Sequence, residues 1–182
     1  MMMTRLATRL SFFLFAASAF TVSAGDVAKS PTPKEVVQTF FAYLAASDTT
    51  ASPDISTDKS AQERWLSREL RDELRRANEF IRLQKPKAGD IPVSPIGNAS
   101  FRFAWDPPHK CVVTETISAP YTAVVATNWI WEPDQEYAGS NQRAYFILVL
   151  EDRGWPVFDI QADSYKFHQS ESSLMRNLKS FR

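Results

Sequence analysis

The chain has 182 residues with 21 basic and 21 acidic side chains, which gives a formal net charge of +0 at pH 7. This balance provides no basic excess for binding phosphates, so we expect no nucleic-acid partner. The single cysteine, Cys111, cannot form an internal disulfide, so packing must stabilise the fold. Free cysteines are most often buried, and we expect Cys111 to pack as a small apolar residue and not to act as a reactive thiol.

Residues 1–24 have the three parts of a secretory signal peptide. Two arginines make the start positive, Leu10–Phe20 forms an apolar core, and Val22–Ala24 supplies the small residues before a cleavage site. The apolar core is shorter than the roughly 20 residues that span a membrane, so an uncleaved anchor is the less favoured alternative. We expect cleavage after Ala24, a periplasmic or secreted product with no stable membrane span, and one domain in residues 25–182.

Residues 32–47 have the pattern of an amphipathic helix. Thr32 is a good N-cap, Pro33 suits the first helical position, and Glu35 can complete a capping box. Apolar residues then recur at helical spacing and form one stripe, which comprises Val36, Val37, Phe40, Phe41 and Leu44. The next segment, residues 46–59, is small and polar and predicts a loop.

A second helical pattern begins at Ser60, which forms another capping-box pattern with Glu63. Ser67 can cap a break between a short first turn and a longer helix. The apolar positions recur every three or four residues, at Trp65, Leu66, Leu70, Leu74, Ala77 and Ile81. Acidic and basic residues alternate on the other face, which indicates a solvated surface and not a basic binding patch. Residues 85–98 are rich in Pro and Gly and predict a loop that covers or lines something.

The pattern changes to strands from Ala99, where aromatic residues alternate at Phe101, Phe103 and Trp105. Two more alternating runs follow, Cys111–Ser118 and Tyr121–Trp131. One face of the first run is predicted to carry Cys111, Val113, Glu115 and Ile117. In the second run we place Val125, Thr127, Trp129 and Trp131 on one face, and Val124, Ala126, Asn128 and Ile130 on the other.

Residues 143–163 predict an antiparallel hairpin at the centre of the sheet. Two apolar runs flank the polar turn Glu151–Gly154, and Gly154 can adopt the left-handed conformation that such a turn needs. Pro156 has no N–H for a ladder, so it predicts an edge or a bulge. The polar tail, residues 163–182, predicts a short, weakly docked helix through Leu174, Leu178 and Phe181.

Because the helices precede the strands, the chain predicts an α+β fold. Three segments, Val36–Leu44, Trp65–Leu70 and Gly154–Ile160, resemble the nuclear-transport-factor-2-like superfamily, and within it exported bacterial members of unknown function. The resemblance covers about residues 33–163. It implies a cone, in which N-terminal helices pack on a strongly curved antiparallel sheet with a pocket at the open end. The superfamily includes isomerases, dehydratases, transport factors and non-catalytic binders, so the resemblance implies no fixed chemistry.

Aromatic side chains with polar tips are candidates to line such a pocket, because binding pockets are mostly apolar with a few polar groups. The candidate ligand-binding residues are Tyr43, Trp65, Asn128, Trp129 and Tyr145.

Two carboxylates, Glu115 and Asp159, are candidate catalytic residues because each shares a strand face with apolar side chains. Burial raises the pKa of a carboxyl group toward the range of a general base. Asn128 or Tyr145 would then donate to an oxyanion. The two histidines, His109 and His168, are far apart and lack metal-ligand spacing, so we expect no metal and no cofactor.

Three functions follow. The first is an exported, non-catalytic domain whose cone pocket binds a small molecule or a peptide, which the sparse set of acid–base groups favours. The second is an isomerase or lyase that uses Glu115 or Asp159 as base. The third is a protein-interaction module, a homodimer formed through an open sheet face that carries Trp129 and Trp131.

Overall fold

The computed structural model describes residues 30–46, 54–84, 96, 100–101, 108–131, 133, 142–162 and 172–181. The predicted signal peptide and its cleavage site lie outside these residues, as do Phe103, Trp105 and His168. Within the described ranges, no helix is both long and apolar enough to cross a membrane.

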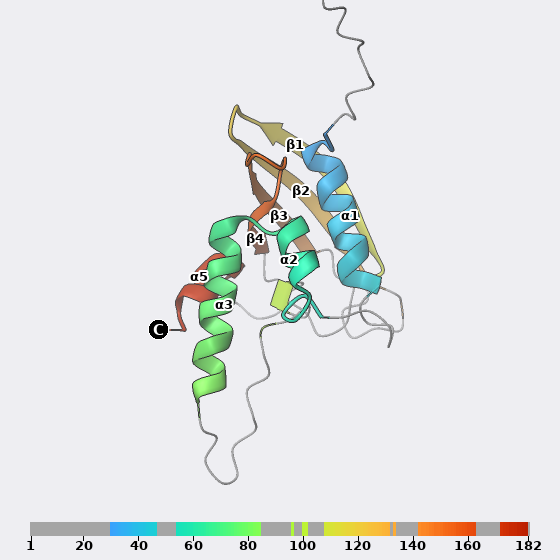
Figure 1. Cartoon of the computed structure of the whole chain (residues 1–182). Coiled ribbons are helices and arrows are strands. Elements are labelled where there is room, and N and C mark those ends of the chain that lie inside the picture. Colours follow the sequence, from blue (N-terminus) through green and yellow to red (C-terminus); the bar gives the residue numbers. More distant parts are fainter. Residues whose placement is uncertain are drawn as a thin grey trace, which may run out of the picture.

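The described part of the chain is α+β with an antiparallel sheet, as predicted. The helices are α1 (Pro33–Ala46), α2 (Lys59–Trp65), α3 (Arg68–Leu83) and α5 (Leu174–Lys179). The strands are β1 (Lys110–Ser118), β2 (Thr122–Ile130), β3 (Gln142–Val149), β4 (Val157–Ala162) and β5 (Ser172–Ser173), paired in that order. Figure 1 shows α1 lying across β1 and β2, with α3 and α5 beside β4. In this part of the chain the sheet is open, and it is neither closed nor strongly curled.

Local side-chain chemistry explains where the first helices begin. Thr32 and Glu35 form the predicted capping box, with the Thr32 N–H donating to Glu35 Oε2 at 2.8 Å and the Glu35 N–H to Thr32 Oγ1 at 3.3 Å. The start predicted at Ser60 is wrong, because the Asp58 carboxylate lies two residues earlier and caps α2 at 3.0 Å. Ser67 caps α3 as predicted, by accepting a backbone N–H at 3.2 Å.

Phe40 of α1 is the centre of the core. Its side chain is fully buried, and its ring centroid lies 5.9 Å from that of Trp65, 6.2 Å from Phe101 and 6.4 Å from Phe146. These rings come from α1, α2, the segment before β1, and β3, so one side chain joins helices to sheet. The strand predicted from Ala99 is wrong at its described residues, because Ser100 and Phe101 are helical and Phe101 is buried by α1.

A β-bulge at Thr114 divides β1 into two halves. Val113 pairs with Thr127 and Glu115 pairs with Ala126, so Thr114 is the extra residue. The alternation of faces therefore reverses at this point. The predicted common face of Val113 and Glu115 is wrong, because the bulge turns Glu115 to the opposite, exposed side of the sheet.

The hairpin predicted in residues 143–163 is present as β3 and β4. Glu151 and Gly154 exchange two backbone hydrogen bonds of 2.9 Å, and Gly154 has φ = 110°, the positive value that glycine tolerates best. Pro156 precedes the strand, where only its carbonyl is needed, and that carbonyl accepts from the Val149 N–H at 3.2 Å. The missing proline N–H therefore costs the ladder nothing.

The C-terminal helix is present as α5, but the expectation of weak docking is wrong. Leu174, Met175 and Leu178 are all buried, and the Phe181 ring lies 6.2 Å from that of Phe80 on α3. Strand β5 ties the same segment to the edge of β4. The buried side of α5 is therefore part of the core.

The central position of Phe40 leads to a stability prediction. Truncation in the variant Phe40→Ala removes contacts with three rings and leaves a cavity, so we expect a loss of about 3–5 kcal/mol in the free energy of unfolding. Urea denaturation followed by circular dichroism measures this loss. The control Leu83→Ala changes a helix residue that is 64% exposed, and it should stay within about 0.5 kcal/mol of the wild type. Equal losses in the two variants would contradict the central position of Phe40.

Candidate functional site

The structure does not bring the five predicted binding residues together. Trp129 is fully buried, with its ring centroid 6.2 Å from those of two phenylalanines. Asn128 and Tyr145 are half-buried on the opposite face of the sheet. Tyr43 lies near the start of α2. Of the five predicted residues, Trp65 alone lines the groove described below.

Tyr43 joins α1 to the start of α2. Its hydroxyl donates to Asp58 Oδ2 at 3.3 Å, and the same carboxylate caps α2. Burial raises the pKa of Tyr43 to about 12, with further contributions from the negative charges of Asp58 and Asp54. This phenol is therefore a neutral donor at physiological pH and acts as a structural tie.

Asp159 is buried on β4 and is saturated with hydrogen bonds. Its Oδ1 accepts from the N–H groups of Ile160 at 2.8 Å and Met175 at 2.9 Å, and its Oδ2 accepts from Ser173 Oγ at 2.8 Å and Gln161 Nε2 at 3.3 Å. A carboxylate has about four lone-pair sites, so these donors occupy all of them. The geometry makes Asp159 an anchor for α5, and it offers no lone pair to a substrate proton.

The other titratable candidates are also poorly placed for chemistry. Glu115 is exposed on the outer face of the sheet. Cys111 is half-buried beside Thr127 and Trp129, and burial raises the pKa of its thiol to about 11. The thiol is therefore protonated at neutral pH, in agreement with the predicted packing role. Among the described residues, no group of three or more His, Cys, Asp or Glu side chains is arranged to hold a metal ion.

A groove of about 520 Å³ lies between the start of α1, the end of α2 and the turn into β4. We call it the aromatic groove, and its apolar lining consists of Pro31, Val36, Trp65, Trp155 and Pro156. Arg64 and Arg153 supply positive charge, and Glu35 supplies a carboxylate. The Arg64 guanidinium lies 4.5 Å from the centroid of the Trp65 ring, a distance typical of a cation–π contact.

Sequence reasoning identified Trp65 but missed Trp155, Arg64 and Arg153. The sequence did contain a signal for Trp155, because Gly154-Trp155-Pro156 places a large aromatic residue directly after a tight turn. Residues of turns lie at the surface, where a tryptophan more often binds a ligand than packs in the core. The arginines gave no signal of their own, because both lie in charged segments that have the pattern of a solvated surface.

Three contacts join the β3–β4 turn to the connection between α2 and α3. The Ser67 N–H donates to the Val157 carbonyl at 2.8 Å, and the Arg68 N–H donates to Glu151 Oε1 at 2.9 Å. The Arg153 guanidinium donates to the backbone carbonyl of Leu66, the residue directly after α2. We call this set the helix–turn joint, and it holds the two walls of the aromatic groove at a fixed separation.

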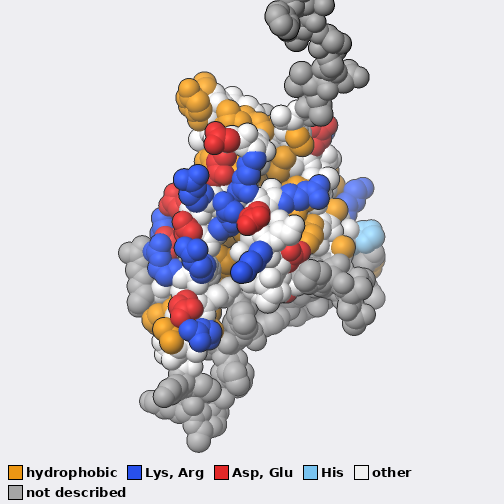
Figure 2. Space-filling model, viewed as in Figure 1, with side chains coloured by type: hydrophobic (Ala, Val, Ile, Leu, Met, Phe, Trp, Pro, Cys, Tyr) orange, Lys and Arg blue, Asp and Glu red, His pale blue; other side chains and the backbone are white. Residues whose placement is uncertain are grey.

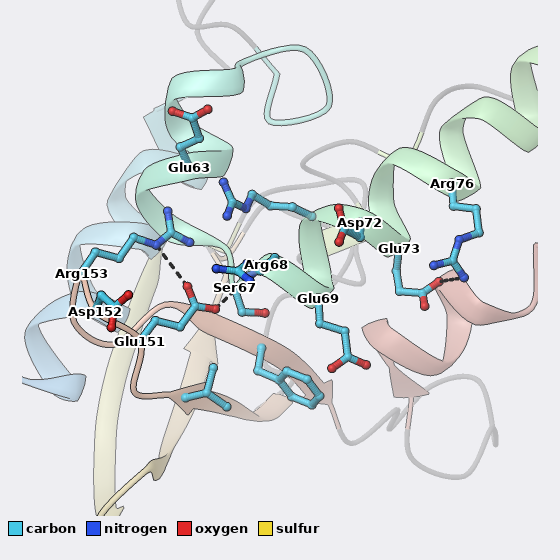
Figure 3. Close-up of a pocket in the computed structure, with 13 residues that line it drawn as sticks. Glu63, Ser67, Arg68, Glu69, Asp72, Glu73, Arg76, Glu151, Asp152 and Arg153 are labelled. Atoms are coloured by element: carbon cyan, nitrogen blue, oxygen red, sulfur yellow. Dashed lines mark hydrogen bonds and ion pairs between the residues drawn. The ribbon is translucent and has the colours of Figure 1, made fainter.

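A second hollow, the charged cleft, lies on the other side of the same turn and has a volume of about 970 Å³. Its lining comes from the end of α2, the first half of α3 and the β3–β4 turn, and it includes Arg153, which also lines the aromatic groove. Figure 2 shows Lys and Arg side chains gathered on this face, with acidic side chains between them. Figure 3 shows the labelled charged residues arranged around the hollow.

The comparisons with known proteins add no relationship. No family model matches the chain, and no curated protein and no solved structure gives a match. The function must therefore be argued from the aromatic groove, the charged cleft and their side chains.

The four hydrogen bonds to Asp159 predict that its charge is structural. In the variant Asp159→Asn, an amide N–H₂ group faces donors where an oxygen accepted before, so we expect a loss of roughly 2–3 kcal/mol in stability. Chemical denaturation at pH 7 checks this. The matched control Glu115→Gln alters an exposed carboxylate on another strand and should leave the midpoint unchanged. An unchanged midpoint in both variants would remove the anchoring role.

The raised pKa of Tyr43 predicts a pH dependence with a definite sign. The folded-state pKa of about 12 exceeds the value of about 10 in an unfolded chain. The folded state therefore keeps this proton where the unfolded state loses it, and stability falls as the pH rises from about 10 to about 12. Urea titrations across this range should show a shallower fall for Tyr43→Phe than for the wild type. The control Tyr121→Phe, at a position that is 75% exposed, should follow the wild-type curve.

Proposed function

We propose that the chain is an exported, non-catalytic binding domain that takes a small molecule or a peptide into the aromatic groove. The observation that carries this proposal is the pair Trp65 and Trp155, which line one groove from two separate elements, α2 and the turn into β4. Trp155 is half-buried and offers the flat apolar surface, while Trp65 is 8% exposed and forms the base of the groove beneath the Arg64 guanidinium. An indole that is held in place binds at a low cost in conformational entropy.

The lining supports a ligand with a flat or cyclic apolar group. Prolines and tryptophans together form grooves that accept proline-rich or aromatic segments in extended peptides. Arg64, Arg153 and Glu35 supply a few polar groups at the rim, which is the usual balance of a binding pocket. Export and a relationship to the nuclear-transport-factor-2-like superfamily belong to this proposal, with the aromatic groove taking the place of the pocket that the resemblance implies.

The absence of catalysis is supported by the surroundings of the two carboxylates. The oxygens of Asp159 are occupied by four donors, and Glu115 is exposed on the outer face of the sheet. The isomerase or lyase alternative requires a base that faces a bound substrate. Neither carboxylate lines the groove or the charged cleft.

A protein-interaction module is the second candidate, but through a different surface from the one predicted. Trp129 and Trp131 are both buried, so these two side chains offer no surface for the predicted dimer. Ile117, Tyr121 and Leu150 are 60%, 75% and 43% exposed, and the Leu150 N–H donates to the Tyr121 carbonyl at 2.9 Å. Apolar side chains exposed together at the β1–β2 turn favour a protein contact there.

The first test compares the two candidates with one probe. Anilinonaphthalene sulfonate carries flat rings and one negative charge, so we expect it to bind in the aromatic groove and to fluoresce. The variant Trp155→Ala should weaken this binding at least tenfold, because one apolar wall is lost. The control Tyr121→Ala should leave the affinity unchanged.

The opposite result, in which Tyr121→Ala abolishes binding and Trp155→Ala does not, would transfer the binding site to the β1–β2 turn. Mass spectrometry of small molecules that remain on the purified chain then identifies the natural ligand. A molecule from that extract should displace the dye from the wild type, since both would occupy the same groove.

A further inference from the structure

We propose that the charged cleft is an anion site, in which the guanidinium groups of Arg68 and Arg71 bind a carboxylate or phosphate group of a small molecule. The site lies on the opposite side of the β3–β4 turn from the aromatic groove. It involves none of the apolar lining of that groove, so it does not depend on the function proposed above.

The first argument is the pairing of charges within the cleft. Of the six carboxylates in the lining, four already have a basic partner at 2.9–3.3 Å; these are Glu69, Asp72, Glu73 and Glu151. Arg76 and Arg153 are among those partners. Arg68 and Arg71 make no ion pair within the described ranges of the chain. Two guanidinium groups are therefore left over at one hollow.

The second argument is a buried donor on Arg71. Its Nε atom is shielded from solvent and has no hydrogen-bond partner among the described residues. Buried N–H groups without a partner are uncommon in folded proteins, because leaving such a group unpaired costs free energy unless an ion or ligand supplies the acceptor. The Nε atom itself is closed to solvent, so an anion in the cleft would contact the terminal guanidinium nitrogens of Arg71, which lines the cleft.

The third argument is the start of α3, where the protein already binds a carboxylate. Glu151 Oε1 accepts the Arg68 N–H at 2.9 Å, and Glu151 Oε2 lies 3.3 Å from Arg153 Nε. Figure 3 shows Glu151 between the Arg153 side chain and the backbone at the start of α3, with a dashed line to each. α3 has 16 residues, and its positive end favours anionic oxygens near its first turn. The Arg68 guanidinium is then free for a second anionic group.

The remaining carboxylates limit what can bind. The lining holds six acidic and four basic residues, so its net charge is −2 and it exerts no long-range attraction on anions. Recognition must come from short, charge-assisted hydrogen bonds, which the planar arginine fork makes in pairs. Glu63 and Asp152 repel further negative charge, so the ligand is a small molecule with one or two anionic groups and not a polyanion.

The test is a nuclear magnetic resonance titration of the full ¹⁵N-labelled chain with inorganic phosphate and, separately, with citrate, at constant ionic strength. The expected result is a set of shifts confined to the amides of residues 67–76 and of the β3–β4 turn. The variants Arg68→Gln and Arg71→Gln should each weaken binding at least tenfold. Arg71→Lys should weaken it by less, because the charge stays and only the fork is lost.

The matched control is Arg143→Gln, which removes an exposed arginine on β3 that does not line the cleft. It should bind both probes like the wild type. Shifts with phosphate alone identify a phosphorylated ligand, and shifts with citrate alone identify a carboxylate; either result supports the site. The proposal is overturned if neither probe shifts the start of α3, or if Arg143→Gln weakens binding as much as Arg71→Gln. The wild-type shift map decides the question even where a variant fails to fold.

Discussion

The aromatic groove and the charged cleft both depend on the helix–turn joint. Its three contacts connect the residues between α2 and α3 to the β3–β4 turn, which is more than 80 positions away in the chain, as in the 83-residue separation of Arg68 and Glu151. One wall of the aromatic groove and one wall of the charged cleft belong to that turn. A binding site needs its walls at a fixed distance, and these three contacts join the walls of both hollows.

The elements that the sequence predicted well are those whose cause is local. The capping box of Thr32 and Glu35 lies within one turn of helix, and the positive φ of Gly154 within one four-residue turn. The apolar stripe of α1 repeats over three turns. In each case the residues that act on one another are close in the chain, so the pattern alone carries the information.

The elements that the sequence did not predict depend on partners that are far apart. The bulge at Thr114 is defined by the register of β1 against β2, and Asp159 is defined by donors at Ser173 and Met175. Likewise, Trp65 belongs to a groove because Trp155 is brought near it by the turn into β4. A periodic pattern identifies which side chains are apolar, but it does not say which of them meet.

The bulge at Thr114 also affects how readily the edge of the sheet can pair with other copies of the chain and aggregate. Within the described ranges, β1 has a strand neighbour only on the β2 side, so its outer rim of backbone groups is a surface on which another chain can assemble into a fibril. The extra residue interrupts that rim halfway along, and its hydroxyl turns inward to the Ala126 carbonyl at 3.2 Å. The edge of β1 therefore offers two short stretches of backbone that are out of register, and not one continuous strand for another chain to pair with. A single extra residue in this way reduces the tendency of the edge to aggregate.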